Sequence, residues 1–565
     1  MKQKRIQINW QQLLIATGFF MFSGFTGAAN FDALNQSESN FQNIEQTGPD
    51  NGGSNSSSIL NSLQQSQAES KKDRYLEVLN LIKQSKIQEA QNKVAGLIKQ
   101  FPDEAQFYNL QALLEILNKN IDGAKKAYNK ALEIDRNNAA AHLGLAKMAL
   151  DANDFATAKE RANSVLAFNE KFTSAYLVLA DVAFKQKNND EVERVLRTGL
   201  DKVKGNIIQS AELLGVLGRF YMSQKQPEKF VTAAEELVNQ SKEDTKALAL
   251  LAGAQILNKQ SDAAEATLAK IIKKDPSDIN HRLLLVKLLS NKPDKEKEIL
   301  SLLDETAKID GNNHQADIFK VAYLIKLNRN QEALTIAENL EKKYPKLAIG
   351  KLLKGDVALA EKQFDKALAL YQQAHAIEAN NTVLFAIADI LKSQGKSDEA
   401  IALLEKESAK DNKNNGIHFK LATLHQLQNK LDKAQLHYEA MLNQQADNPL
   451  ALNNLAWLYL QQNNPKALEF AKKAHELAPD ASAITDTYGY ILLKQGKASD
   501  GLPLIEKAVA ETPKDNTMQY HLAEAYAANN NKAKAIEILE KLVAPDVSFT
   551  EKADAEALLK KLKAE

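Results

Sequence analysis

The sequence predicts an all-α fold, a solenoid of about fourteen helix–turn–helix repeats that ends in a capping helix. Three observations lead to this prediction. Apolar and small residues recur at helical spacing along most of the chain, and the pattern repeats about every 34 positions. Proline, which would break helices, accounts for only 12 of the 565 residues.

Charge and composition exclude some classes of function. Lys plus Arg and Asp plus Glu each number 72, so the formal net charge is zero and no general basic field attracts nucleic acid. Cysteine is absent, which excludes disulfides, cysteine nucleophiles and cysteine metal ligands. Hydrophobic residues at 44% and charged residues at 25% are ordinary for a folded protein. We therefore expect a large helical protein that does not bind nucleic acid.

Residues 1–29 are predicted to be a targeting segment. Three basic residues lie within the first five positions, and an apolar stretch follows from Leu13 to Ala29. Gly27 and Ala29 are the small residues expected before a signal-peptide cleavage site. The alternative is an uncleaved inner-membrane anchor, for which this stretch is short. In both cases the basic residues at the beginning of the chain stay on the cytoplasmic side of the membrane. The rest of the chain is then periplasmic or secreted, or anchored to the inner membrane and facing the periplasm.

Residues 30–70 are predicted to be a flexible tether. Of the 36 residues from 35 to 70, 24 are Ser, Asn, Gln or Gly, and none is Lys or Arg. Such a stretch has too little apolar surface to offset the entropy lost on ordering. It would separate the targeting segment from the repeats.

The repeats begin at residue 71. Amphipathic helices over 124–135, 367–374 and 467–479 each place small or aromatic residues at positions i, i+4 and i+7 of one face. Marking position i along the chain gives fourteen units with a mean spacing near 34, at Ala90, Ala124, Ala158, Val192, Phe230, Ala264, Ile299, Ala333, Ala367, Ala400, Ala434, Ala467, Gly501 and Ala535. A period of 34 with two helices per unit is typical of one family of solenoids.

The chain resembles the tetratricopeptide repeat (TPR) proteins over residues 72–548. Two antiparallel helices approach closely where the facing residues are small, and the facing position of the first helix is Ala or Gly in eleven units: Ala112, Ala146, Ala180, Gly218, Ala252, Gly355, Ala388, Ala422, Ala456, Gly489 and Ala523. The resemblance implies a right-handed superhelix whose first helices line a concave groove that holds peptides or partner domains.

The regularity of the repeats divides the chain further. Residues 71–190 and 311–548 are expected to form regular blocks, and residues 191–310 an irregular stretch. In that stretch bulky Val192, Phe230 and Ile299 replace the small residue of the second helix, and we expect inserted residues to lengthen the turns. Residues 549–565 are expected to form a capping helix with Ala553 and three leucines on its buried side.

Motifs of catalysis and cofactor binding are missing from the sequence. It contains no phosphate-binding glycine loop, nucleophile elbow or HExxH motif. His418, His425 and His437 form the one group of histidines, which we interpret as packed or solvated side chains rather than metal ligands. The sequence therefore predicts a protein that is not an enzyme and needs no cofactor or metal.

The groove positions of the C-terminal repeats are the candidate binding residues. On each first helix they are the residue after the small position and the residue three before it. In three consecutive repeats they are Asn453, Trp457, Asp486, Tyr490, Tyr520 and Glu524. Aromatic and polar residues are enriched in binding surfaces and hot spots. The alternative for the aromatic residues is packing between repeats.

The C-terminal third carries a narrower resemblance. The strings at 453–457, 471–480, 486–496 and 520–523 resemble the TPR proteins of bacterial exopolysaccharide and PEP-CTERM protein-sorting systems. The resemblance implies a non-enzymatic envelope scaffold that binds protein partners in its groove and assists assembly or export of exopolysaccharide or surface proteins. The alternative is a groove that binds glycan or peptidoglycan directly.

Overall fold

The computed structural model describes residue 71, residues 73–311 and residues 314–564. The predicted targeting segment and tether lie outside the described residues. The chain divides into two compact units, Met1–Phe319 and Lys320–Glu565. All regular structure in the described residues is helical, and every described helix is too short or too polar to cross a membrane.

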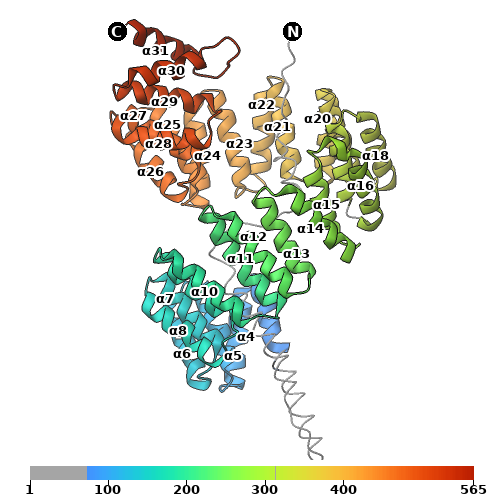
Figure 1. Ribbon diagram of the computed structural model, residues 1–565, viewed down its shortest axis with the longest axis vertical. Coiled ribbons are helices and arrows are strands. Elements are labelled where there is room, and N and C mark those ends of the chain that lie inside the picture. Colours follow the sequence, from blue (N-terminus) through green and yellow to red (C-terminus); the bar gives the residue numbers. More distant parts are fainter. Residues whose placement is uncertain (1–70, 72, 312–313, 565) are drawn as a thin grey trace, which may run out of the picture. The chain divides into compact units, whose positions relative to one another are not determined.

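In the first unit, a helix over residues 73–83 opens a series of helix pairs (Figure 1). The helices that follow are α4 (Ile87–Gln100), α5 (Ala105–Leu117), α6 (Ile121–Ile134), α7 (Ala139–Asp151), α8 (Phe155–Phe168), α9 (Thr173–Lys185), α10 (Asn189–Lys202), α11 (Ile207–Ser223), α12 (Pro227–Gln240), α13 (Thr245–Leu257), α14 (Ser261–Lys274), α15 (Ile279–Leu289), the 3₁₀ turn η1 (Pro293–Lys295) and α16 (Glu296–Asp310). Helix α17 (Gln315–Lys326) spans the boundary between the units.

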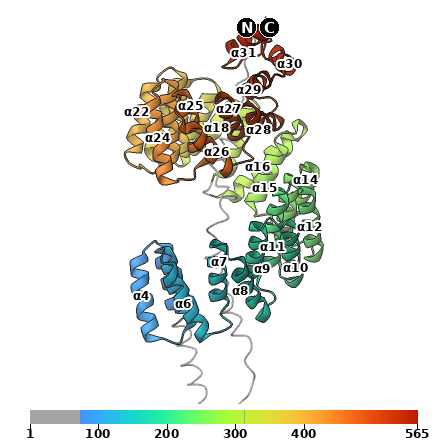
Figure 2. The same ribbon diagram turned by 90° about the vertical axis from the view of Figure 1, so that its left-hand side faces the viewer.

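The second unit continues the same alternation, which Figure 2 shows from another side. Its helices are α18 (Asn330–Lys343), α19 (Ile349–Ala360), α20 (Phe364–Ile377), α21 (Asn381–Ser393), α22 (Ser397–Ser408), α23 (Asn415–Leu427), α24 (Leu431–Gln444), α25 (Pro449–Gln461), α26 (Lys466–Leu477), α27 (Ser482–Lys494), α28 (Ala498–Glu511), α29 (Asn516–Ala528), α30 (Lys532–Leu542) and α31 (Lys552–Ala564). From the helix over 73–83 to α30 the helices form fourteen pairs, which confirms the predicted all-α solenoid.

Capping residues mark the beginning and the end of the first helices. Asn138 and Asp515, for example, accept hydrogen bonds from backbone N–H groups inside α7 and α29, which satisfies donors that the first turn leaves open. After each first helix a residue usually adopts positive φ, as at Lys119, Asn153 and Gly395. This left-handed residue ends the helix and turns the chain into its antiparallel partner.

The predicted small residues do bring paired helices together. Ala112 and Ala124 are fully buried in the α5–α6 pair. In the α27–α28 pair the backbones approach so closely that a Cβ on Gly501 would lie 2.4 Å from the carbonyl oxygen of Gly489. First helices also contact the first helices of neighbouring repeats, as α25 with α27 and α27 with α29. This stacking forms a solenoid rather than a set of separate hairpins.

The irregular repeats differ from expectation in one respect. The extra residues between Val192 and Phe230 do not lengthen a turn, because they extend α11 to 17 residues where most first helices have 13. The prediction of a longer turn is wrong here. Gly218 on α11 faces the ring of Phe230, and a Cβ there would lie 2.5 Å from that ring. At the Ile299 repeat the connection does lengthen, through η1.

Helix α31 packs on the last helix pair as a cap. Ala555 and Leu562 are buried, and Leu558 and Leu559 pack against the core of the final repeat. Ala553 was expected on the buried side but is exposed. The helix starts at Lys552, so Ala555 and Leu562 share the inward face at helical spacing.

Candidate binding surface on the C-terminal repeats

The six predicted groove residues lie on α25, α27 and α29, the first helices of three consecutive repeats. Asn448 caps α25 by accepting from the N–H of Ala451 at 3.1 Å, and Pro449 occupies its first turn. Because the three helices are held in register by stacked repeats, equivalent positions on them come to lie next to one another. We call these residues and the side chains that they contact the C-terminal surface.

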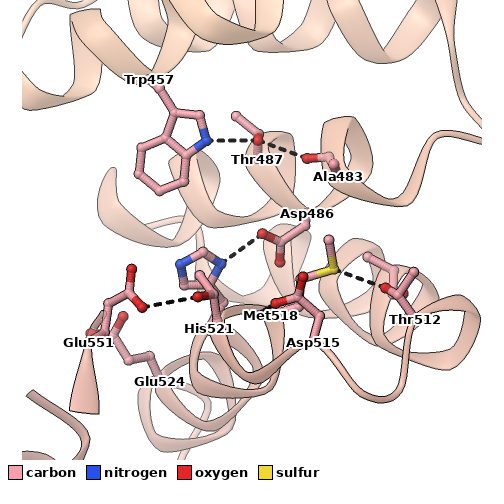
Figure 3. A network of polar contacts seen from close by, with 12 residues as sticks. Trp457, Ala483, Asp486, Thr487, Thr512, Asp515, Met518, His521, Glu524 and Glu551 are labelled. Atoms are coloured by element: carbon pink, nitrogen blue, oxygen red, sulfur yellow. Dashed lines mark hydrogen bonds and ion pairs between the residues drawn. The ribbon is translucent and has the colours of Figure 1, made fainter. Parts of the chain in front are cut away.

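Trp457 is the first aromatic residue of this surface. Its Nε1 donates a hydrogen bond of 3.0 Å to Thr487 Oγ1, and that hydroxyl donates to the carbonyl oxygen of Ala483 at 2.8 Å (Figure 3). The indole centroid lies 5.4 Å from the ring centroid of Tyr490 on the next first helix. Trp457 is half-buried, so its polar edge is fixed between repeats while part of the ring stays accessible.

Beneath Trp457 lies a residue that the sequence reasoning missed, His521. Its Nδ1 lies 2.7 Å from Asp486 Oδ2 (Figure 3). Its ring stacks on Tyr490 with centroids 3.8 Å apart. His521 is 2% exposed and Asp486 is 4% exposed. Removing that one ring partner from a buried carboxylate would strongly destabilise the folded chain. The small-residue rule does not select His521 as a groove position, and its place in the string 520–523 assigned it no role.

Two buried oxygen atoms of the surface have no hydrogen-bond partner. They are Oδ1 of Asp486 and Oδ1 of Asn453, at equivalent positions of α27 and α25. A buried acceptor without a donor costs about 1–3 kcal/mol. Asn453 is 9% exposed, and its Oδ1 accepts no hydrogen bond. Both oxygens are closed off from solvent, so they mark tight packing between the repeats rather than acceptors that face the groove.

Charged groups border the aromatic rings. Lys494 Nζ lies 2.8 Å and 3.0 Å from the two carboxylate oxygens of Glu524, and 4.7 Å from the centroid of Tyr490. Burial, reinforced by the nearby charge of Glu524, raises the pKa of Tyr490 and of Tyr520 well above the ordinary value. Both phenols are therefore neutral hydrogen-bond donors at physiological pH.

The structure brings the six predicted residues together, but only three of them keep part of their surface accessible. Trp457, Tyr490 and Glu524 are half-buried, whereas Asn453, Asp486 and Tyr520 are buried. The ring of Tyr520 lies 6.3 Å from that of Phe549 before the capping helix. Packing between repeats is thus part of what these side chains do, and ligand binding by them stays a prediction.

The three histidines of α23 and α24 also meet. His418 and His437 place their Nδ1 atoms 3.2 Å apart, and the rings of His425 and His437 are parallel. His418 Nε2 is held by the carbonyl oxygen of Asn412 at 3.0 Å. Burial, with smaller effects from His418 and His425, lowers the pKa of His437 to about 4. The described residues contain no group of three or more ligands arranged for a metal ion.

The repeats match known protein families. Two family models described as tetratricopeptide repeat match the chain, one at residues 75–139, 322–382 and 489–547, the other at residues 115–176, 221–288 and 358–424. Together they span more than half of the sequence. The chain is a tetratricopeptide repeat protein.

A curated relative supports the same family. The TPR repeat-containing protein PA4667 of Pseudomonas aeruginosa is 26% identical over 236 residues, which are 41% of this TPR chain. The match spans about a third (34%) of that relative's length. The narrower resemblance to exopolysaccharide and PEP-CTERM systems stays a prediction.

Two solved structures are similar at low identity. The hetero-tetramer Cut9–Hcn1 of APC/C matches with 14% identity and a TM-score of 0.36, covering 81% of this chain and 96% of that chain. Naa15/Naa10 bound to HypK-THB matches with 14% identity and a TM-score of 0.36, covering 95% and 96%.

Proposed function

We propose that this TPR protein is a non-enzymatic scaffold of the bacterial envelope that binds protein partners in the groove of its first helices. Its role would be to assist the assembly or export of exopolysaccharide or surface proteins. The C-terminal surface carries this proposal, because half-buried Trp457 and Tyr490 lie next to one another on consecutive first helices, with the Lys494–Glu524 pair beside them. Partly accessible aromatic side chains beside charged groups suit a protein segment that brings both apolar and polar side chains.

The envelope location is part of the proposal and is supported by sequence features. These are the basic and apolar pattern of residues 1–29, the polar composition of residues 30–70 and the absence of cysteine. The mature chain would be periplasmic or secreted, or anchored in the inner membrane if residues 1–29 are retained. N-terminal sequencing of the protein from fractionated cells tests this location. A mature chain that starts at Met1 and fractionates with the cytoplasm would refute it.

A photocrosslinking experiment tests the groove. A photoreactive phenylalanine analogue replaces Trp457 in the full chain in cells, and a control chain carries it at Leu436, an exposed residue of the second helix α24. We expect a discrete protein adduct at position 457 that is absent at position 436. Equal adducts at both positions, or none at either, would contradict protein binding at the C-terminal surface.

Glycan binding is the second candidate, and half-buried Trp457 favours it because an accessible indole ring can stack on a sugar. Tyr490 weakens this candidate, because His521 stacks on its ring and Lys494 lies over it, so less of the ring is open to a sugar. Titration of Trp457 fluorescence with neutral oligosaccharides separates the candidates. A saturable response there, without a protein adduct at position 457, would favour the glycan.

A further inference from the structure

Three histidine side chains meet inside one helix pair of the second unit. His418 and His425 lie on α23, and His437 lies on α24, the antiparallel partner of α23 (Figure 1). His418 and His425 are buried, and His437 is half-buried. We call these three residues the histidine cluster. Imidazole is the side chain whose ordinary pKa lies closest to neutral pH, so small changes in pH can change the charge of this pair.

The contacts of His418 determine where the hydrogen atoms of the cluster lie. Its Nε2 is 3.0 Å from the carbonyl oxygen of Asn412, which can only accept, so Nε2 carries the hydrogen. In the neutral ring Nδ1 is then bare, and it accepts a hydrogen bond from Nδ1 of His437 at 3.2 Å. The two rings therefore fit together when both are neutral.

Protonation of His418 or His425 would leave an N–H group without an acceptor. A proton on His418 would place hydrogens on both Nδ1 atoms, and two N–H groups would face one another across 3.2 Å. The buried Nδ1 of His425 has no hydrogen-bond partner among the described residues. The ring of His425 is parallel to that of His437, with centroids 5.6 Å apart, so a charge on either ring lies next to the other. The packed pair thus suits neutral imidazoles.

The charged groups beside the cluster also oppose protonation. Lys430 and Lys433 lie at the start of α24 and disfavour a proton on His425, whereas Glu405 of α22 favours it. Lys433 disfavours a proton on His437 as well. Two cations against one carboxylate therefore add to the cost of charging the buried rings.

Helices α21 and α25 also pack against this pair. Helix α25 contains no charged residue, and its one titratable side chain, Tyr459, is neutral because burial raises the pKa of its phenol. Asp389 of α21 pairs with Lys420 of α23 at 2.7 Å. Glu439 of α24 accepts a hydrogen bond of 2.7 Å from Gln435. These two carboxylates thus have partners other than the imidazoles.

The direction of the imidazole pKa values agrees with this geometry. Burial, reinforced by the other two histidines and Lys433, lowers the pKa of His437 to about 4, and burial lowers the pKa of His425 as well. When the pair opens, the rings regain the ordinary value of 6.5, so the open form binds protons more readily than the packed form between these pH values. Acid therefore shifts the equilibrium towards the open pair.

We propose that the histidine cluster makes the α23–α24 pair acid-sensitive, so that this pair opens on mild acidification before the pairs on either side. The opening would need no bound partner, and it would reverse when the imidazoles lose their protons. In an array where each pair contacts mainly its neighbours, one pair can open while distant pairs stay folded. Because α24 packs on α25, which carries Trp457, opening would also withdraw support from the C-terminal surface.

Hydrogen exchange of the full chain at pH 7 and pH 5 measures the opening, once the intrinsic exchange rate at each pH is corrected for. We expect the opening constant of amides in α23 and α24 to rise about tenfold at pH 5. This is within the roughly 30-fold that a full return of the His437 pKa from about 4 to 6.5 allows. The α21–α22 and α5–α6 pairs contain no histidine, and their opening constants should rise less than about threefold.

Two single variants assign the response to the cluster. His437→Gln keeps an N–H donor for His418 but cannot take up a proton, and it should reduce the rise in α23 and α24 to less than about threefold. The matched control is His375→Gln on α20, a half-buried histidine outside the cluster, and it should leave the rise of about tenfold unchanged. Each chain is compared with itself at two pH values, so a general loss of stability in a variant does not affect the result.

Four outcomes would overturn the acid-sensitive pair. The first is a rise below about threefold in the unaltered chain, and the second is an equal rise in either pair that lacks histidine. The third is a rise of about tenfold that persists with His437→Gln, because the protons would then be taken up elsewhere. The fourth is a loss of the rise with His375→Gln, because that histidine lies outside the cluster.

Discussion

Replacing His521 by Ala tests whether the buried pair with Asp486 holds the C-terminal repeats together. The change removes the 2.7 Å contact to Asp486 and the ring stacked on Tyr490. Oδ1 of Asp486 already has no partner, so the variant leaves the whole carboxylate without one at a site that is 4% exposed. Breaking a buried pair by removing one member costs about 3–5 kcal/mol.

The matched variant is Asp486→Ala combined with His521→Ala. It removes both members of the pair, so no carboxylate is left buried alone, and its cost should be well below the sum of the two single changes. We expect a coupling free energy of about 1–3 kcal/mol between the two residues. Asp432→Ala, an exposed carboxylate of α24, is the control and should change stability by less than about 0.5 kcal/mol.

Native-state hydrogen exchange is the suitable measurement, because a long repeat array need not unfold in two states. Loss of the pair should lower the opening free energy of amides in α27 and α29, with little change in α5 to α10, since each repeat contacts mainly its neighbours. A loss below about 1 kcal/mol in α27 and α29, or strictly additive single variants, would refute the reasoning.

Three further predictions concern the second unit. Tyr520→Ala should destabilise the C-terminal repeats by about 3–5 kcal/mol, because the ring is buried. Trp457→Ala should cost clearly less stability and mainly weaken binding, because Trp457 is half-buried. Equal losses of exchange protection in the two variants would contradict this difference. Deleting residues 549–565 should expose the core of the last helix pair and unfold the final repeats first, and uniform loss of protection along the chain would argue against a solenoid. The pKa of His437 is about 4 in the folded chain against an ordinary 6.5. Between these pH values the unfolded chain binds a proton more readily than the folded chain. The free energy of unfolding is therefore kept above pH 6.5 and falls as the pH drops towards 4. At pH 5 the loss is at most about 2 kcal/mol before solvent screening, and His437→Gln should remove this dependence in urea unfolding at pH 5 and pH 7.

The sequence by itself determined the repeat architecture of this protein. Small residues such as Ala112 with Ala124 and Gly489 with Gly501 predict close helix pairs, because side-chain volume limits how near two backbones can come. Their spacing near 34 fixes the order of the pairs. The same rule selected Trp457, Tyr490 and Glu524 as neighbours, since equivalent positions on stacked repeats must share one face.

Only the tertiary structure decided how that face is built. His521 is not a groove position of the repeat pattern, and it pairs with Asp486 because repeat stacking brings α27 and α29 together across 35 residues of sequence. The burial of Tyr520 and the partnerless oxygen of Asn453 likewise depend on which neighbouring side chains fill the space between helices. The extra turn of α11 illustrates the same limit, because an inserted segment can extend a helix or a loop and packing selects between them. A repeat pattern determines which positions meet, whereas burial and hydrogen bonding at those positions depend on contacts between repeats.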